Sequence, residues 1–192
     1  QSYSLNVGNN LISYPLSECG AIGEVIPQDA QDCISGIIGE DKSALNLGFG
    51  WGGSLQTLCP NEGYWFVSEC DINFTFIEPT SLARQQVLNP SPYPYNQSSQ
   101  QAFYYIESVE NIKIGDWIFS YNGETVIGAR EWTGEIIDVP AMGDDGSDFT
   151  KGYIQTGSIP TFKLLSGGNL TNLVGDIPAF ANNQLYMVGS LS

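Results

Sequence analysis

The stretch FSYNGETVI, residues 119–127, carries the clearest signal of the fold. Two runs rich in aromatic and β-branched residues flank Asn122-Gly123, and both of these residues tolerate the positive φ that a type I′ turn requires. Runs of this kind joined by such a dipeptide are typical of a β-hairpin. The stretch therefore predicts two adjacent antiparallel strands.

Strand patterns continue on both sides of this hairpin. In the second half of the chain we expect strands at residues 102–107, 117–121, 125–132, 153–155, 161–165 and 184–188. Short strands at this spacing, with no helical periods between them, indicate a β-sandwich.

The first half has a similar pattern with one exception. Strand signals cover residues 5–16 and 55–77, where apolar and polar residues alternate in places. Between them, residues 27–38 start with a proline and carry isoleucines at helical spacing, which predicts a short helix. We therefore expect an all-β protein made of two small β-sandwich-like modules, with one short helix in the first.

A proline-rich stretch separates the two modules. The sequence NPSPYPY, residues 89–95, favours extended polyproline geometry and cannot sustain a central strand. The predicted parts are an N-terminal disulfide-containing module at 1–82, a connector at 83–101 and a C-terminal β-sandwich module at 102–192.

The charge of the chain excludes several classes of function. Its 192 residues include 21 carboxylates, only six Lys and Arg, and no histidine, which gives a formal charge of −15. So few positive charges cannot form the cationic face that nucleic acid requires, and an anionic membrane surface would repel the chain. Apolar runs are too short for a membrane-spanning helix. We expect neither a nucleic-acid partner nor membrane insertion.

Four cysteines lie within the first 70 residues, at Cys19, Cys33, Cys59 and Cys70. An even number in a turn-rich region, without CxxC spacing, indicates two disulfides, although four reduced core thiols in a cytosolic protein are the alternative. Three pairings are possible. We favour Cys19 with Cys33 and Cys59 with Cys70, because each pair closes a short local loop.

Two sets of motifs resemble known extracellular modules. The first is NLISYPL at residues 10–16, ISGIIGE at 34–40, WGGSL at 51–55 and GYWF at 63–66; the second is NQSSQQAF at 96–103, GDWI at 115–118, YNGE at 121–124, IGAR at 127–130 and IPTFK at 159–163. The first set resembles a module of secreted bacterial surface proteins that opens with NLIS-P and closes with GYW. The second is similar to a β-sandwich module that often precedes a secretion-sorting domain, and similar pairs occur in marine bacterial and phage proteins.

The resemblance implies an extracellular location and no catalytic role. The N-terminus, Gln1-Ser2-Tyr3, agrees with this because it has the character of a mature chain whose export signal has been removed.

The densest acidic cluster is GDDGSD, residues 143–148. Asp144, Asp145 and Asp148, with backbone carbonyls next to glycine, suit a hard cation such as Ca²⁺, although the spacing is not that of an EF-hand. The alternative is a solvated acidic turn between strands. Calcium is the cofactor that the sequence suggests.

Aromatic residues are the other candidate binding groups. Tyr93 and Tyr95 each follow a proline in the connector and, with Trp132, can present flat faces to a sugar ring or to another protein. The alternative for the two tyrosines is packing between the modules. Pairs of carboxylates that could act as glycosidase acid and base are present, but nothing distinguishes any pair, so no catalytic residue is expected.

These observations lead to three hypotheses about function. The first is a secreted structural protein, a subunit of an extracellular filament, appendage or virion fibre whose copies assemble by β-strand contacts. The second is an adhesin or carbohydrate-binding module that binds a surface polysaccharide through exposed aromatic residues. A glycoside hydrolase is the least favoured.

Overall fold

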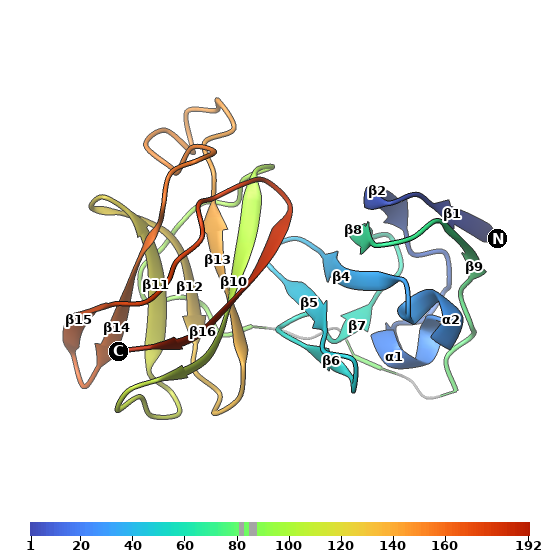
Figure 1. Cartoon of the computed structure of the whole chain (residues 1–192), viewed down its shortest axis with the longest axis horizontal. Helices are drawn as coiled ribbons and strands as arrows, with labels where there is room; N and C mark the ends of the chain where they lie inside the picture. The colour runs from blue at the N-terminus through green and yellow to red at the C-terminus, as the bar shows by residue number, and fades with distance from the viewer. Residues whose placement is uncertain (81–82, 85–87) are drawn as a thin grey trace. The chain divides into compact units, whose positions relative to one another are not determined.

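The chain folds into two compact units. The computed structural model describes residues 1–80, 83–84 and 88–192. Their contacts divide the chain into unit 1, Gln1–Leu88, and unit 2, Asn89–Ser192 (Figure 1). The predicted boundary at residue 82 lies outside the described residues. From Asn89 onward, the predicted connector is part of unit 2.

The predicted all-β class is confirmed, with about 45% of the residues in strands and 4% in helices. Unit 1 contains β1 (Ser2–Leu5), β2 (Gly8–Ser13), β3 (Gly20–Ala21), α1 (Ile22–Val25), α2 (Gln28–Gln31), β4 (Ile34–Ile38), β5 (Ser43–Asn46), β6 (Trp51–Gly52), β7 (Thr57–Leu58), β8 (Gly63–Ser68) and β9 (Ile72–Thr75). Unit 2 contains β10 (Gln101–Val109), β11 (Trp117–Asn122), β12 (Thr125–Glu131), β13 (Ile137–Met142), β14 (Thr161–Ser166), β15 (Asn169–Leu173) and β16 (Gln184–Leu191).

The main sheet of unit 1 has five antiparallel strands in the order β2-β8-β4-β5-β6. Two smaller sheets, β1-β9 and β3-β7, complete the unit. Phe66 on β8 and Phe74 on β9 belong to one buried cluster that also contains residues of α1 and α2. The sheets and the short helices of unit 1 therefore enclose a common core.

The helix prediction for residues 27–38 is wrong over its second half. The helix α2 ends at Gln31, and Ile34–Ile38 form β4, which pairs with β8 on one side and β5 on the other. Ile34, Ile37 and Ile38 are all buried. A central strand that is buried on both faces carries a continuous apolar run, and such a run is easily taken for a helix. The four-residue helix α1 was too short to give a periodic signal.

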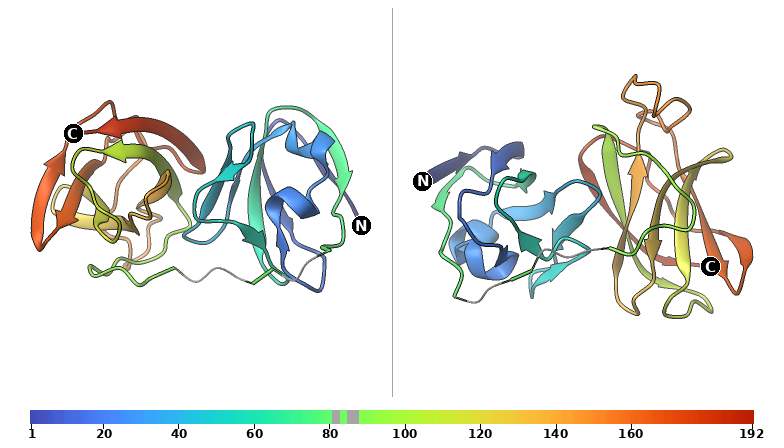
Figure 2. Two further views of the ribbon diagram at one scale, coloured as in Figure 1. Left: turned by 90° about the horizontal axis from the view of Figure 1, so that it is seen from below. Right: turned by 180° about the vertical axis from the view of Figure 1, so that it is seen from behind.

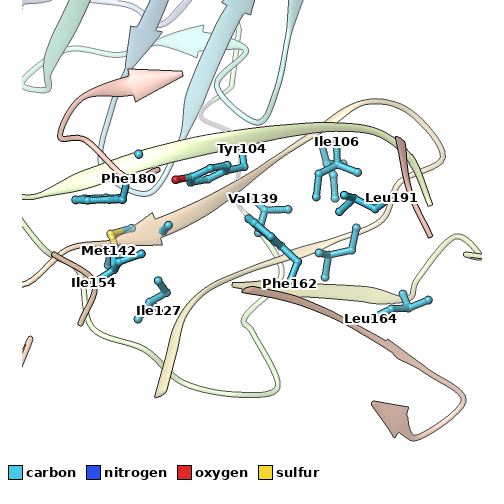
Figure 3. Close-up of a cluster of buried hydrophobic side chains, with 14 of the residues drawn as sticks. Tyr104, Ile106, Ile127, Val139, Met142, Ile154, Phe162, Leu164, Phe180 and Leu191 are labelled. Atoms are coloured by element: carbon cyan, nitrogen blue, oxygen red, sulfur yellow. The ribbon is translucent and has the colours of Figure 1, made fainter. Parts of the chain in front are cut away.

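Unit 2 consists of two sheets that surround one interior (Figure 2). One sheet has the order β13-β10-β16 and the other β12-β11-β14-β15. Phe162 and Leu164 on β14 face Tyr104 and Ile106 on β10 across this interior (Figure 3). The predicted strands near 102–107, 117–121, 125–132, 161–165 and 184–188 are confirmed, whereas the one at 153–155 is a single bridge between Gly143 and Ile154.

The two sheets of unit 2 meet where β12 passes β13. The Ser120 hydroxyl donates a hydrogen bond to the Pro140 carbonyl, and Arg130 Nε donates to the Asp138 carbonyl at 3.0 Å. A Cβ atom at Gly128 would lie 1.9 Å from the Pro140 oxygen. Only glycine permits the backbones of β12 and β13 to approach this closely, so Gly128 is required at the junction.

The predicted hairpin is confirmed, with a difference in its turn. Asn122 pairs with Thr125, so the loop residues are Gly123 and Glu124. Positive φ is confined to Gly123, at 58°, whereas a type I′ turn needs it at both central positions.

Candidate functional site

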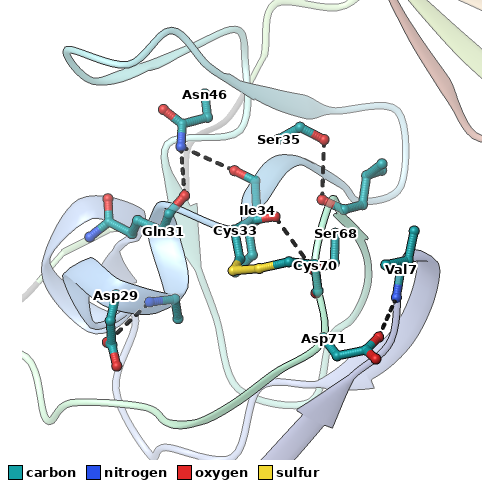
Figure 4. Close-up of a disulfide and its surroundings, with 12 residues drawn as sticks. Val7, Asp29, Gln31, Cys33, Ile34, Ser35, Asn46, Ser68, Cys70 and Asp71 are labelled. Atoms are coloured by element: carbon teal, nitrogen blue, oxygen red, sulfur yellow. Dashed lines mark hydrogen bonds between the residues drawn. A yellow bond between two sulfur atoms is a disulfide. The ribbon is translucent and has the colours of Figure 1, made fainter.

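Both disulfides in unit 1 extend antiparallel strand pairs. Cys19 bonds to Cys59, with the Cα atoms 4.2 Å apart, immediately beyond the pair between Gly20 and Leu58. Cys33 bonds to Cys70, with Cα atoms 5.4 Å apart, beyond the paired strands β4 and β8 (Figure 4).

The predicted pairing of Cys19 with Cys33 and of Cys59 with Cys70 is therefore wrong. That prediction favoured the pairs that close the shortest loops, and loop length determines the entropy of the unfolded chain only. In the folded chain, the strand pairing brings together cysteines that are 40 and 37 residues apart in sequence. Two disulfides indicate an oxidising, extracellular environment. None of the helices among the described residues is long and apolar enough to cross a membrane.

The strand β2 forms one edge of the five-stranded sheet in unit 1. Its sequence, GNNLIS, contains no charged residue and no proline. Asn10 holds the chain reversal before it, since its Oδ1 accepts from Asn6 N at 3.0 Å and its Nδ2 donates to Asn6 O at 2.7 Å. Val7 and Leu11 are 68% and 60% exposed. This edge is ordered, uncharged and partly apolar.

A second edge of the same character lies in unit 2. The strand β15, NLTNL, ends the sheet β12-β11-β14-β15, and four of its five residues are exposed. Leu170 is 42% exposed, and Val174, just after the strand, is 70% exposed. β15 was not predicted, although Gly167-Gly168 between two leucine-containing runs is a hairpin signal that marks it.

Natural proteins protect exposed edges with charged side chains, prolines or bulges, because an open edge pairs with other chains. Among the described strands, β2 and β15 each have one neighbour, and they have neither charge nor proline to deter a second. The N-terminal strand β1 pairs with β9 of the same chain, so it too has one neighbour. β1 is therefore an intramolecular strand and is not donated to a neighbouring copy.

The predicted aromatic binding residues do not form one site. Trp132 is only 7% exposed and belongs to the core of unit 2, so its ring offers no face to a ligand. Tyr93 lies against Phe119, with ring centroids 4.8 Å apart, and remains 38% exposed. Tyr95 is half-buried and packs against the cluster that contains Phe119 and also against the main core of unit 2. The two tyrosines thus pack onto unit 2. From the sequence we expected them either to bind a ligand or to pack between the modules.

The acidic segment follows β13 and is organised by Asp145. Its Oδ1 accepts from Thr150 Oγ1 at 2.6 Å and from Ser147 N at 3.0 Å, and its Oδ2 accepts from Ser99 N at 3.2 Å. The hydrogen bonds from Thr150 and then Ser147 hold the pKa of Asp145 well below its usual range, because they favour the charged form.

The neighbouring carboxylates have different surroundings. Asp144 Oδ1 accepts from Gly146 N at 2.9 Å, and Asp148 is exposed. In the part of the chain that the structure describes, no group of three or more acidic, histidine or cysteine side chains is placed to hold a metal ion. Asp145 therefore has a structural task in the loop, and calcium at Asp144, Asp145 and Asp148 stays a prediction.

Comparisons with protein families, with curated proteins and with solved structures give no match to this chain. The function must therefore be inferred from the geometry of the chain itself.

Proposed function

We propose that this protein is a secreted structural subunit that assembles with copies of itself through β-strand contacts, as in an extracellular filament, appendage or virion fibre. The observation that carries the proposal is that β2 and β15 are uncharged, exposed edge strands in different units. Strand addition at such an edge supplies main-chain hydrogen bonds, and exposed apolar side chains such as Leu11 and Leu170 lose their contact with water.

Two different edges favour an open assembly. β2 belongs to unit 1 and β15 to unit 2. When β2 of one copy pairs with β15 of the next, the interface joins unlike surfaces, and every added copy presents a new unpaired edge. Contacts of this heterologous type produce filaments unless the rotation between copies closes a ring.

The charge of the chain opposes this assembly and makes it sensitive to salt. Each copy carries a formal charge of −15, so approaching copies repel. The Debye length falls from about 10 Å at 0.1 M salt to about 3 Å at 1 M, which screens this repulsion. The uncharged edges leave the contact itself free of like charges. We therefore expect assembly to increase with ionic strength.

The direct test is the size of the full chain in solution. Sedimentation velocity and electron microscopy of the disulfide-intact protein, over a range of concentrations and from low to high salt, should show chains of growing length. Monomers at every concentration and salt level would contradict the proposal.

Lysine substitutions identify the edges. Leu11→Lys on β2 and Thr171→Lys on β15 should each stop assembly, because an edge lysine cannot be buried against a neighbouring strand. Thr133→Lys, in an exposed loop outside both edge strands, makes the same change of charge and should assemble like the unmodified chain.

A mixture of the two edge variants tests which edges meet. Leu11→Lys retains β15 and Thr171→Lys retains β2, so a mixture should form dimers that cannot extend. Dimers of Leu11→Lys alone would instead show that β15 pairs with itself. Assembly of all three variants at the level of the unmodified chain would overturn the assignment to these edges.

A further inference from the structure

Unit 1 contains a cavity that strand assembly does not use. It has a volume of about 520 Å³ and lies between α2, the start of β4 and the loop that joins β5 to β6. Ligand pockets in proteins occupy roughly 300–1,000 Å³, so this cavity is large enough for a small molecule or for one segment of a polymer. One part of its lining is apolar and aromatic, and another is polar and acidic.

The aromatic part comes from the β5–β6 loop. Phe49 is 89% exposed and lies between Gly48 and Gly50, which have φ values of 81° and 156°. Leu47 N donates to Gly50 O at 2.9 Å and closes this loop. The geometry of the loop presents a large apolar ring to water beside a cavity, where it can cover a ligand. Trp51, half-buried, adds a second ring to the lining.

The side-chain amides of Gln31 and Asn46 hold this aromatic part in place. Trp51 Nε1 donates to Gln31 Oε1 at 2.9 Å, and Gln31 Nε2 donates to Ile26 O at 2.7 Å. Asn46 Nδ2 donates to the carbonyls of Gln31 and Ile34 at 2.8 and 3.0 Å (Figure 4). These bonds tie the hairpin to α2 and β4, so the cavity is formed before a ligand arrives and little ordering is needed on binding.

The polar part consists of side chains that retain hydrogen-bonding capacity. Asp32 accepts from Gln28 Nε2 at 2.8 Å through one oxygen, and Glu69 and Ser35 also line the cavity. Ser35 Oγ donates to Val67 O at 3.3 Å and can still accept. The lining residues include two carboxylates and neither lysine nor arginine. An anionic ligand would therefore be repelled.

We propose that this cavity binds a neutral sugar ring of a polysaccharide. A pyranose has a C–H face that packs on aromatic rings and a rim of hydroxyl groups that donate to carboxylates, and the cavity offers Phe49 and Trp51 for the first and Asp32 and Glu69 for the second. This site is distinct from the predicted residues Tyr93, Tyr95 and Trp132, which belong to unit 2.

The test is binding of the full chain to immobilised neutral polysaccharides, namely a β-glucan, a mannan, a xylan and a galactan, with alginate and chitosan as anionic and cationic comparisons. At least one neutral polysaccharide should bind with a dissociation constant in the micromolar to millimolar range, and alginate should not. A neutral ligand should bind equally well at low and high salt, because no ion pair is formed.

Phe49→Ala is the first variant, since its ring is exposed and its loss should leave the fold intact. It should weaken binding by about tenfold, which is the effect expected from the loss of one aromatic contact. Phe149→Ala is the matched control, because Phe149 is 77% exposed and belongs to unit 2, whereas the cavity is lined by unit 1, and binding should be unchanged. Glu69→Gln keeps the shape of the side chain and should weaken binding without abolishing it.

Three outcomes would overturn the proposal. They are no binding to any of the four neutral polysaccharides, equal binding by the Phe49→Ala variant and the unmodified chain, and salt-sensitive binding to chitosan alone, which would assign the cavity to an organic cation. The assembly-deficient Thr171→Lys variant should bind the polysaccharide normally, so failure of one proposal is separable from failure of the other.

Discussion

The two units form sheets around a core by different means. Unit 1 relies on short pieces, including the two-residue strands β3, β6 and β7, and both disulfides lie there. Unit 2 contains no cysteine. Its strands include the nine-residue β10 and the eight-residue β16, and its two sheets bury one continuous cluster.

This difference reflects how much of the strand pairing each unit can maintain by itself. The two-residue strands β3 and β7 contribute few hydrogen bonds, so the crosslink at the end of their pair holds them together, and the second crosslink joins the ends of β4 and β8. Small domains with limited cores commonly use disulfides in this way. In unit 2, long strands and a large apolar interior make covalent links unnecessary.

Removal of both disulfides should have the largest effect and should be confined to unit 1. The two disulfides close loops of 40 and 37 residues. In the chain-entropy model, each disulfide contributes about 4 kcal/mol to the free energy of unfolding. Reduction, or replacement of all four cysteines by serine, should therefore unfold unit 1. Hydrogen exchange measured on peptides from each unit is the readout. Loss of protection in unit 2 at the same reductant concentration would contradict the comparison.

The unmodified, unreduced chain tests the connectivity. Digestion under non-reducing conditions should give peptides that link Cys19 with Cys59 and Cys33 with Cys70.

A matched pair of core substitutions should show similar effects in separate units. Phe162 in unit 2 is 1% exposed and Phe66 in unit 1 is fully buried. Replacement of either by alanine should destabilise its own unit by about 3–5 kcal/mol, through lost burial and a residual cavity. Thermal unfolding followed by the same peptide-resolved exchange will locate the change. If Phe162→Ala also lowers the stability of unit 1, the units do not unfold independently.

Alkaline pH should weaken unit 1 partly through Tyr14, whose buried hydroxyl has no hydrogen-bond partner among the residues that the structure describes. Burial, and then the charges of Glu78 and Glu24, raise the pKa of Tyr14 to about 12. The stabilisation from the neutral phenol is complete below pH 10, the ordinary value, and is lost as the pH rises from 10 toward 12, because the unfolded chain ionises first. Tyr14→Phe should reduce this alkaline loss.

At pH 7 the same substitution should change the stability by less than about 1 kcal/mol, because no hydrogen bond is removed. The melting temperature measured from pH 7 to 11.5 gives both values. A variant that is strongly destabilised at pH 7 would show that the hydroxyl has a partner in solution.

Calcium binding at the predicted site should have the smallest effect on stability, and it should stabilise unit 2 alone. If the dissociation constant is about 1 mM, 10 mM Ca²⁺ should stabilise unit 2 by about 1.4 kcal/mol, and a chelator should reverse this. The double variant Asp144→Asn with Asp148→Asn should abolish the response while the hydrogen bonds of Asp145 are kept. An unchanged melting temperature would identify the segment as a turn held by Asp145 alone.

Local patterns were sufficient for most of unit 2. The hairpin around Gly123 follows from residues that are neighbours in sequence, and so do the alternating strands on either side. Two strands, β13 and β15, were missed. β13 contains Pro140 and is buried along its whole length, and β15 is exposed along most of its length, so neither alternates.

The edge strands β2 and β15 also show that local sequence patterns do not predict every feature. The sequence of β2 lay within a predicted strand, but nothing in the six letters GNNLIS states that one side of the strand is unpaired. Likewise, Trp132 resembles an exposed aromatic residue in sequence, and only its position among the buried residues of unit 2 excludes that role.

By itself, the sequence determined the all-β class, the charge, the hairpin and the presence of crosslinks, because these depend on composition and on residues close together in the chain. The tertiary structure decided which cysteines pair, which strands lie at edges and which side chains enclose the cavity beside Trp51. Each of these depends on contacts between residues distant in sequence, where strand order selects one arrangement from several that the same local patterns allow.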